Sequence, residues 1–340
     1  MLDKDSLVSK HIGNYRTVTK ISSSSPISTT YKAEHIDRKH TFVALKIFHT
    51  IHLSQQQPDL FFQEVQRHKR LKHSHLLPLL DAGIDNDVPY LVTEYIEGNS
   101  LRDRLRSRPG HLLPVQEAVT ILTRIGRALY YAHQRNVVHG RLKPENILLR
   151  EGREVLLTDF SLVTLTDTLG TMDAYPANIY PYMAPEQFAG WMNKSSDQYA
   201  LGCIAYELFT GRAPFAGSDF AAMQKKHSSE KPGAPTQQNL LLPIVLEEVV
   251  LKAIEKNSAD RYPTIQDFMA ALQPSPPVHT AKSLTSKMLR VAKPPAKPAQ
   301  TKPLAPTIST TNLPEDVKHK GAKTKMVRID SNPQVDKPCP

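Results

Sequence analysis

Cysteine is nearly missing from this sequence, whose 340 residues include only Cys203 and Cys339. Two cysteines cannot build a disulfide framework, and no cluster of cysteine and histidine has the spacing of a zinc site. No apolar run approaches the roughly 18 residues needed to cross a bilayer, and the polar segment 1–10 has no apolar signal core. The sequence therefore predicts a cytoplasmic protein with no transmembrane segment.

The positive charge of the sequence is concentrated towards its C-terminus. The net charge is +10, and residues 274–340 carry 12 Lys and Arg against 4 Asp and Glu, a balance of +8. The same segment holds 12 of the 27 prolines and no Phe, Tyr or Trp, so it cannot bury enough apolar surface to offset its ordering entropy. We expect a disordered linker or docking tail. Binding of nucleic acid or an anionic surface is the less favoured alternative, because no aromatic residue is there to stack on bases.

The rest of the sequence divides into a β-rich part and a helical part. Short alternating or apolar runs at 15–21, 41–48 and 90–94 predict strands, and helical spacing over 60–71 predicts one helix among them. Beyond Gly98 the apolar residues recur at helical spacing. Four further helices are expected at 115–134, 196–210, 246–256 and 264–272.

Four short motifs occur in a characteristic order and spacing. They are Val43-Ala-Leu-Lys46, His139-Gly-Arg-Leu-Lys-Pro-Glu-Asn146, Asp159-Phe-Ser161 and Ala184-Pro-Glu186. Together they resemble the signature motifs of protein kinases, and the sequence around the last of them is most similar to that of bacterial serine/threonine kinases. The resemblance implies an α+β, bilobal protein-kinase fold, with a small β-rich N-lobe and a larger helical C-lobe.

The resemblance also implies the domain organisation. The kinase-like domain would span residues 14–272, with its N-lobe at 14–96 and its C-lobe at 97–272. An N-terminal extension at 1–13 and the disordered, basic tail rich in proline and lysine at 273–340 would flank it.

By the same resemblance, several residues would form a site for ATP and Mg²⁺. Lys46 would hold the α- and β-phosphates and pair with Glu64, which stands on the helix predicted over 60–71. Asn146 and Asp159 would supply the oxygen ligands that a hard Mg²⁺ ion requires. The remaining residues of the pocket would enclose the adenine: Ala44, Glu94, Ile96 and Leu148.

The position of the catalytic base is occupied by an arginine. Active kinases have an aspartate there, which accepts or orients the proton of the substrate hydroxyl, whereas this chain has Arg141. A guanidinium carries five donors and no acceptor and stays protonated at physiological pH, so it cannot be the base. Losing a general base costs about 10² to 10⁴ in rate. Lys143, which matches a lysine that contacts the γ-phosphate in active relatives, is retained, but no intact catalytic set is left.

Two further departures weaken the grip on phosphate. The glycine positions of the phosphate-binding loop fall at Ser23, Ser25 and Ser28, and Pro26 removes one backbone donor. Ile179 stands where active relatives have a threonine that hydrogen-bonds to the catalytic loop. Both changes point to reduced phosphate binding.

We therefore interpret the sequence as that of a pseudokinase, a signalling regulator or scaffold that binds ATP and Mg²⁺ weakly or not at all. The alternative is a serine/threonine protein kinase of reduced activity that transfers the γ-phosphate of ATP to protein hydroxyls. It stays open because Lys46, Glu64, Asn146 and Asp159 are retained and phosphoryl transfer depends heavily on electrostatics. In both interpretations the expected partners are other proteins, either signalling kinases or their substrates.

Overall fold

A computed structural model describes residues 7–25, 28–48, 57–150, 154–160 and 176–273. These residues belong to one compact unit, residues 1–279. The disorder expected for the tail and the role expected for Pro26 lie outside the described residues. Within the described part of the chain, no helix is long and apolar enough to cross a membrane.

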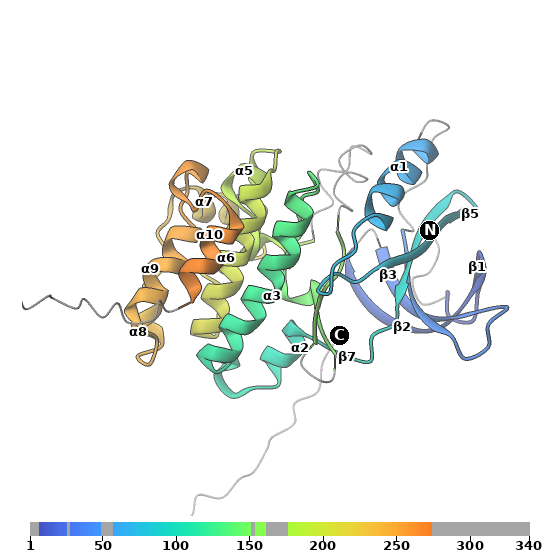
Figure 1. The fold of residues 1–340 in the computed structure, drawn as a ribbon, viewed down its shortest axis with the longest axis horizontal. Helices are drawn as coiled ribbons and strands as arrows, with labels where there is room; N and C mark the ends of the chain where they lie inside the picture. The colour runs from blue at the N-terminus through green and yellow to red at the C-terminus, as the bar shows by residue number, and fades with distance from the viewer. Residues whose placement is uncertain (1–6, 26–27, 49–56, 151–153, 161–175, 274–340) are drawn as a thin grey trace, which may run out of the picture. The chain divides into compact units, whose positions relative to one another are not determined.

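The first lobe is built on a six-stranded antiparallel sheet. Its strands are ordered β1-β2-β3-β4-β6-β5, and the sheet and one helix, α1, appear in blue to cyan in Figure 1. The strands are β1 (His11–Ile12), β2 (Tyr15–Ser25), β3 (Ser28–His35), β4 (Phe42–Ile47), β5 (Leu79–Asp85) and β6 (Val88–Glu94).

Alternation along β4 decides which of its side chains face the cleft. Side chains of successive strand residues point to opposite faces. Val43, Leu45 and Ile47 are buried in the core of the lobe, whereas Ala44 and Lys46 are only partly buried on the other face. Lys46 therefore lies on the cleft side, because Val43, Leu45 and Ile47 fill the core of the lobe on the opposite face of the strand.

Helix α1 (Gln57–Lys69) packs against this sheet through a small apolar cluster. Phe61 and Val65, one turn apart, contact Phe48 and Leu91. The sequence pattern placed this helix at 60–71, and the helix begins and ends earlier. Leu71 lies beyond it because its backbone N–H bonds to the carbonyl of His68 in a tight final turn.

The second lobe is mainly helical, with a three-stranded antiparallel sheet at the cleft. That sheet, ordered β7-β8-β9, was not expected from the sequence pattern. Its strands are β7 (Gly98–Ser100), β8 (Ile147–Arg150) and β9 (Glu154–Leu157). The helices are α2 (Leu101–Arg106), α3 (Val115–His133), α5 (Pro185–Phe188), α6 (Lys194–Thr210), α7 (Phe220–Ser229), α8 (Pro235–Gln238), α9 (Ile244–Ala253) and α10 (Ile265–Leu272).

Local capping explains where the predicted helices begin and end. Helix α6 begins at Lys194 because the Asn193 side chain accepts the N–H groups of the next turn, and it ends at Gly211, whose φ of 83° suits glycine. Helix α9 begins two residues before its predicted start, directly after Pro243. The expected helices are therefore confirmed, with shifted ends.

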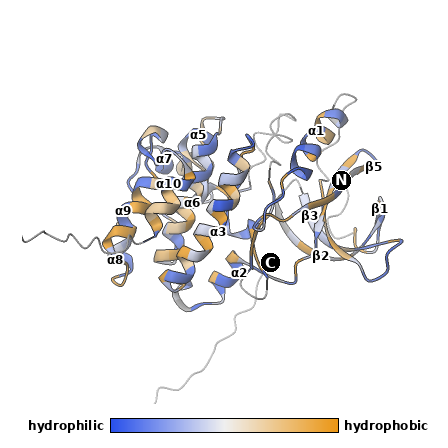
Figure 2. Cartoon of the chain, viewed as in Figure 1, coloured by the Kyte–Doolittle hydropathy of each residue, from blue (hydrophilic) through white to orange (hydrophobic). Residues whose placement is uncertain are grey.

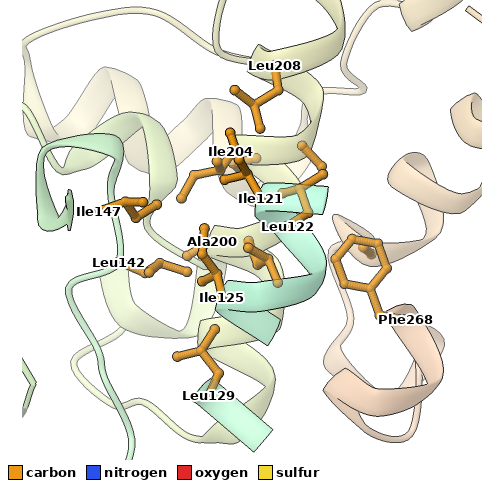
Figure 3. Packing of buried hydrophobic residues seen from close by; sticks show 14 of the residues in the cluster. Ile121, Leu122, Ile125, Leu129, Leu142, Ile147, Ala200, Ile204, Leu208 and Phe268 are labelled. Atoms are coloured by element: carbon orange, nitrogen blue, oxygen red, sulfur yellow. The ribbon is translucent and has the colours of Figure 1, made fainter. Parts of the chain in front are cut away.

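The core of the second lobe lies between α3 and α6. Figure 3 shows the apolar stripe of α3 facing residues of α6, with Phe268 of α10 closing one side. Helix α6 is buried almost all around. Figure 2 shows hydrophobic residues in α6, α9 and α10, and mainly hydrophilic ones along α1. A helix buried on all sides gives this lobe a rigid base for the loops at the cleft.

Candidate functional site

A cavity of about 400 Å³ opens between the sheet of the first lobe and β7–β9. Seven of the ten residues that the sequence assigned to the site line this cavity. They are Ala44, Lys46, Glu94, Ile96, Asn146, Leu148 and Asp159. The other three, Glu64, Arg141 and Lys143, are not among its lining residues.

A short ion pair crosses the back of the cavity. The Nζ atom of Lys46 lies 2.7 Å from Oδ2 of Asp159, and the two side chains are 14% and 23% exposed. Burial alone would raise the pKa of Asp159, but the ammonium of Lys46 outweighs it and holds that pKa below its usual value. Asp159 is therefore a carboxylate held next to the ammonium of Lys46 in the cavity.

The pairing predicted between Lys46 and Glu64 is wrong for this structure. Oε1 of Glu64 lies 3.3 Å from Nη1 of Arg67, one turn further along α1, and Lys46 pairs with Asp159 instead. The other carboxylate oxygen of Glu64 is buried and has no hydrogen-bond partner among the described residues. The physical reason is competition, since Asp159 reaches the single ammonium and Arg67 reaches Glu64 within the same helix.

The side chain of Glu94 also lies differently from the expectation. It is 48% exposed and accepts a hydrogen bond from Nη2 of Arg150 at 2.5 Å. Residues 94–96 still line the cavity. Glu94 therefore borders the pocket at the end of β6, while its carboxylate is engaged with Arg150 at the surface.

Asp197 on α6 anchors the start of the loop from His139 to Asn146. Its carboxylate accepts the backbone N–H groups of His139 and Gly140, each at 2.8 Å, and lies 2.8 Å from Nε2 of His133. Gly140 has a φ of 71°, which glycine adopts without strain. Within the loop, Nδ2 of Asn146 donates to the carbonyl of Arg141 at 2.9 Å. Because Nδ2 of Asn146 is engaged in this bond, its amide oxygen is the atom that could bind a cation.

Glu145 is the one carboxylate of this loop, and its Oε2 has no hydrogen-bond partner among the described residues. Arg141 is 7% exposed, so a buried guanidinium stands at the position of the base. Glu145, the only acidic residue of the motif, receives Nε of Arg102 at 3.1 Å. The loss of the base stays a prediction from the sequence.

Lys143 is positioned by a partner that the sequence did not reveal. Its Nζ donates to Oδ1 of Asn178 at 3.0 Å, next to Ile179, which is buried. Burial lowers the pKa of Lys143 to about 8, helped by the nearby charges of Lys46 and Arg141. Asn178 thus supplies a hydrogen bond of the kind that Ile179 cannot make.

The residues present suit a hard cation that arrives with a nucleotide. One carboxylate, Asp159, and one amide oxygen, Asn146, are the ligand types that Mg²⁺ accepts when phosphates supply further oxygens. No group of three or more His, Cys, Asp or Glu able to hold a metal occurs among the described residues. The donor set therefore fits a metal shared with phosphate and not a cage built by protein alone.

Sequence reasoning missed one cluster beside the site. Arg102, Glu145, Tyr182 and Glu207 join in a buried hydrogen-bonded group. These residues come from four separate parts of the chain, and no local pattern connects them. Ser100 caps the start of α2 with Asp103 three residues on, a local pattern that marks the helix but not its partners.

Comparisons with known proteins place these features in a family. A model of the protein kinase domain matches residues 24–294. The serine/threonine-protein kinase PrkC of Bacillus subtilis is 32% identical over 272 residues, which cover 78% of this chain and 41% of that protein. The serine/threonine-protein kinase PknB of Mycobacterium leprae is 32% identical over 62% of this chain and 35% of that protein. The chain thus spans less than half the length of these curated relatives.

Solved structures agree with the sequence relatives. The crystal structure of the Mycobacterium tuberculosis PknI kinase domain matches with a TM-score of 0.62 and 26% identity, covering 78% of this chain and 97% of that one. The bilobal fold expected from the sequence motifs is confirmed.

Proposed function

This chain belongs to the protein kinase domain family, and from that premise we propose that it is a serine/threonine protein kinase of reduced activity. The observation that carries this proposal is the 2.7 Å pair between Lys46 and Asp159 beside Asn146. The pair brings an ammonium for phosphate and a carboxylate for a metal to the same place in the cavity, where a nucleotide and its metal would engage them separately. The naming of the relatives as serine/threonine kinases supports this alternative better than the pseudokinase interpretation.

Each residue of the cleft has a role in this proposal. Lys46 would hold the phosphates of ATP, and Asn146 and Asp159 would hold Mg²⁺, which supplies charge neutralisation on the phosphate oxygens when bound. Lys143 would add a cation towards the γ-phosphate. Positioning and electrostatics carry most of phosphoryl transfer, so these groups would support a rate even without a base.

Arg141 sets the limit on that rate. The general base contributes about 10² to 10⁴ to the rate where it is present, and a buried guanidinium at this position cannot accept the proton of the substrate hydroxyl. The proton would have to leave to water or to the phosphate itself. The protein would therefore be slow, and its substrates would be hydroxyls of other proteins.

A second candidate is the pseudokinase, a regulator or scaffold in signalling. It is favoured by Arg141 and by Glu64, which is paired with Arg67 in place of Lys46. In that role the cleft would hold nucleotide weakly or not at all, and the partners would be signalling kinases or their substrates.

Metal-dependent ATP binding distinguishes the two candidates. Titration calorimetry of ATP should show affinity that rises with Mg²⁺ in the wild type. Replacing Asp159→Asn should reduce that gain by at least about tenfold, since even outer-shell partners of a metal contribute this much. The matched control is Asp81→Asn, the same change at a carboxylate of β5 that pairs with Lys69 at the end of α1. Equal wild-type affinity with and without Mg²⁺ would count against the kinase proposal.

A further inference from the structure

Arg102 joins three parts of the second lobe through one guanidinium. It lies in the first turn of α2, and its Nε donates to Oε1 of Glu145 at 3.1 Å. Its Nη1 donates to Oε1 of Glu207 at 2.6 Å, and its Nη2 donates to the hydroxyl of Tyr182. One residue thus connects α2 to the catalytic loop, to the end of α6 and to the segment before α5.

The cluster is largely buried, and Oε2 of Glu145 is its one buried side-chain oxygen without a hydrogen-bond partner among the described residues. Arg102, Glu145 and Glu207 have side chains only 16%, 21% and 7% exposed. Although burial opposes its charge, Tyr182 and Glu207 hold the pKa of Arg102 above its ordinary value. The Tyr182 hydroxyl donates to Oε2 of Glu207 at 2.6 Å, and burial together with that carboxylate raises the pKa of Tyr182. A planar guanidinium with several fixed partners is a rigid connection, which a flexible ammonium would not be.

This connection ends one residue from the proposed metal ligand. Glu145 and Asn146 share the short 3₁₀ turn Pro144–Asn146. Asp197 anchors the start of the same loop, at His139 and Gly140. Since Asp197 and Glu207 lie ten residues apart on α6, the two anchors stand about 15 Å apart along one helix. The loop is therefore held at both ends from one rigid element.

We propose that Arg102 is a positioning residue, which holds the turn at Glu145 so that the amide of Asn146 faces the metal that accompanies ATP. This inference rests on the proposed function. Arg102 and Glu145 also line the cavity, and the inference does not involve the ion pair of Lys46 with Asp159.

Electrostatics and positioning predict opposite outcomes when Arg102 is neutralised. Removing a positive charge near a cation site strengthens cation binding if long-range repulsion between the two cations is the only effect. If the arginine instead orients Asn146, its loss weakens Mg²⁺ binding. The Arg102→Gln variant separates these effects because their signs differ. Glu145→Gln alone would not, since both effects weaken binding there.

The test measures ATP affinity with and without Mg²⁺ in the full chain. Arg102→Gln should lower the Mg²⁺-dependent gain by about 10- to 100-fold, the range seen when outer-shell partners are changed, whatever its effect on the metal-free affinity of the cavity that Arg102 lines. Arg104→Gln is the matched control on the same helix, because Arg104 pairs with Glu117 in a half-exposed bridge. It should change neither affinity.

A second variant covers the case in which Arg102→Gln fails to fold. Arg102→Lys keeps the charge and loses the planar fork, so it should also lower the Mg²⁺-dependent gain, whereas a purely electrostatic role would leave that gain unchanged. A gain that is unchanged or larger in both Arg102 variants would overturn the inference and leave the proposed function intact. No gain in the wild type would overturn both.

Discussion

Replacing Arg141 with aspartate should raise the rate of phosphotransfer from ATP by roughly 10² to 10⁴. The loop around this position is already ordered by Asp197 and by the bond from Asn146 to the Arg141 carbonyl. Aspartate would restore a carboxylate able to accept the hydroxyl proton, and it would remove a cation that cannot. The measurement is initial-rate transfer of labelled phosphate from Mg²⁺-ATP to a generic basic protein substrate.

Arg141→Asn is the control for this gain. It removes the same cation and has nearly the size of aspartate, but its amide is not a base. If asparagine raises the rate as much as aspartate, the guanidinium blocks the site and the missing base is not the cause. If neither variant transfers phosphate faster than the wild type, another feature limits the rate, for example the phosphate-binding loop or Ile179.

Removing Arg261 should destabilise the second lobe by about 3 to 5 kcal/mol. Its guanidinium, whose side chain is 0% exposed, donates to both carboxylate oxygens of Glu186 at 2.9 Å and also to backbone carbonyls. Arg261→Ala would leave the charge of Glu186 buried without its cation, and this is the main cost. The free energy of unfolding from urea denaturation measures it.

Arg16→Ala is the matched control, because the Arg16–Glu34 pair of the sheet is exposed on the arginine side. Its loss should cost no more than about 1 kcal/mol.

The pH dependence of the free energy of unfolding gives a second check on Arg261. Burial opposes ionisation of Glu186, but Arg261 holds its pKa below 4.5, so the stability it contributes is present above that pH and is lost as the pH falls through the lower, folded value. An Arg261→Ala variant as stable as the wild type at neutral pH would contradict this prediction.

Short-range patterns predicted much of the fold and much of the cleft. Alternation in β4 placed Lys46 opposite the buried Val43 and Leu45, and the apolar stripe of α3 identified the helix that faces α6. Such features depend on periods of two or 3.6 residues and need no knowledge of distant contacts. Asn146 and Asp159 were instead assigned by the resemblance of their motifs to those of protein kinases, and both line the cavity.

Contacts between distant segments could not be predicted from the sequence. The partner of Lys46 depends on how α1 is rotated and on which carboxylate reaches the ammonium first, and the outcome was Asp159 and not Glu64. Asn178 beside Lys143 and Arg102 beside Glu145 are likewise meetings of side chains from separate elements. No propensity or spacing encodes them, because they are decided by packing of the whole lobe.

In the proposed function, this chain transfers phosphate slowly, with Asn146 and Asp159 holding the metal and no carboxylate at position 141. The most direct test is transfer of label from ATP with Mg²⁺, to the protein itself and to a generic basic substrate, with Asp159→Ala measured alongside. The account predicts slow incorporation by the wild type that the substitution abolishes. No incorporation by either protein, at protein concentrations sufficient to detect a rate 10⁴-fold below that of an ordinary kinase, would contradict it and favour the pseudokinase.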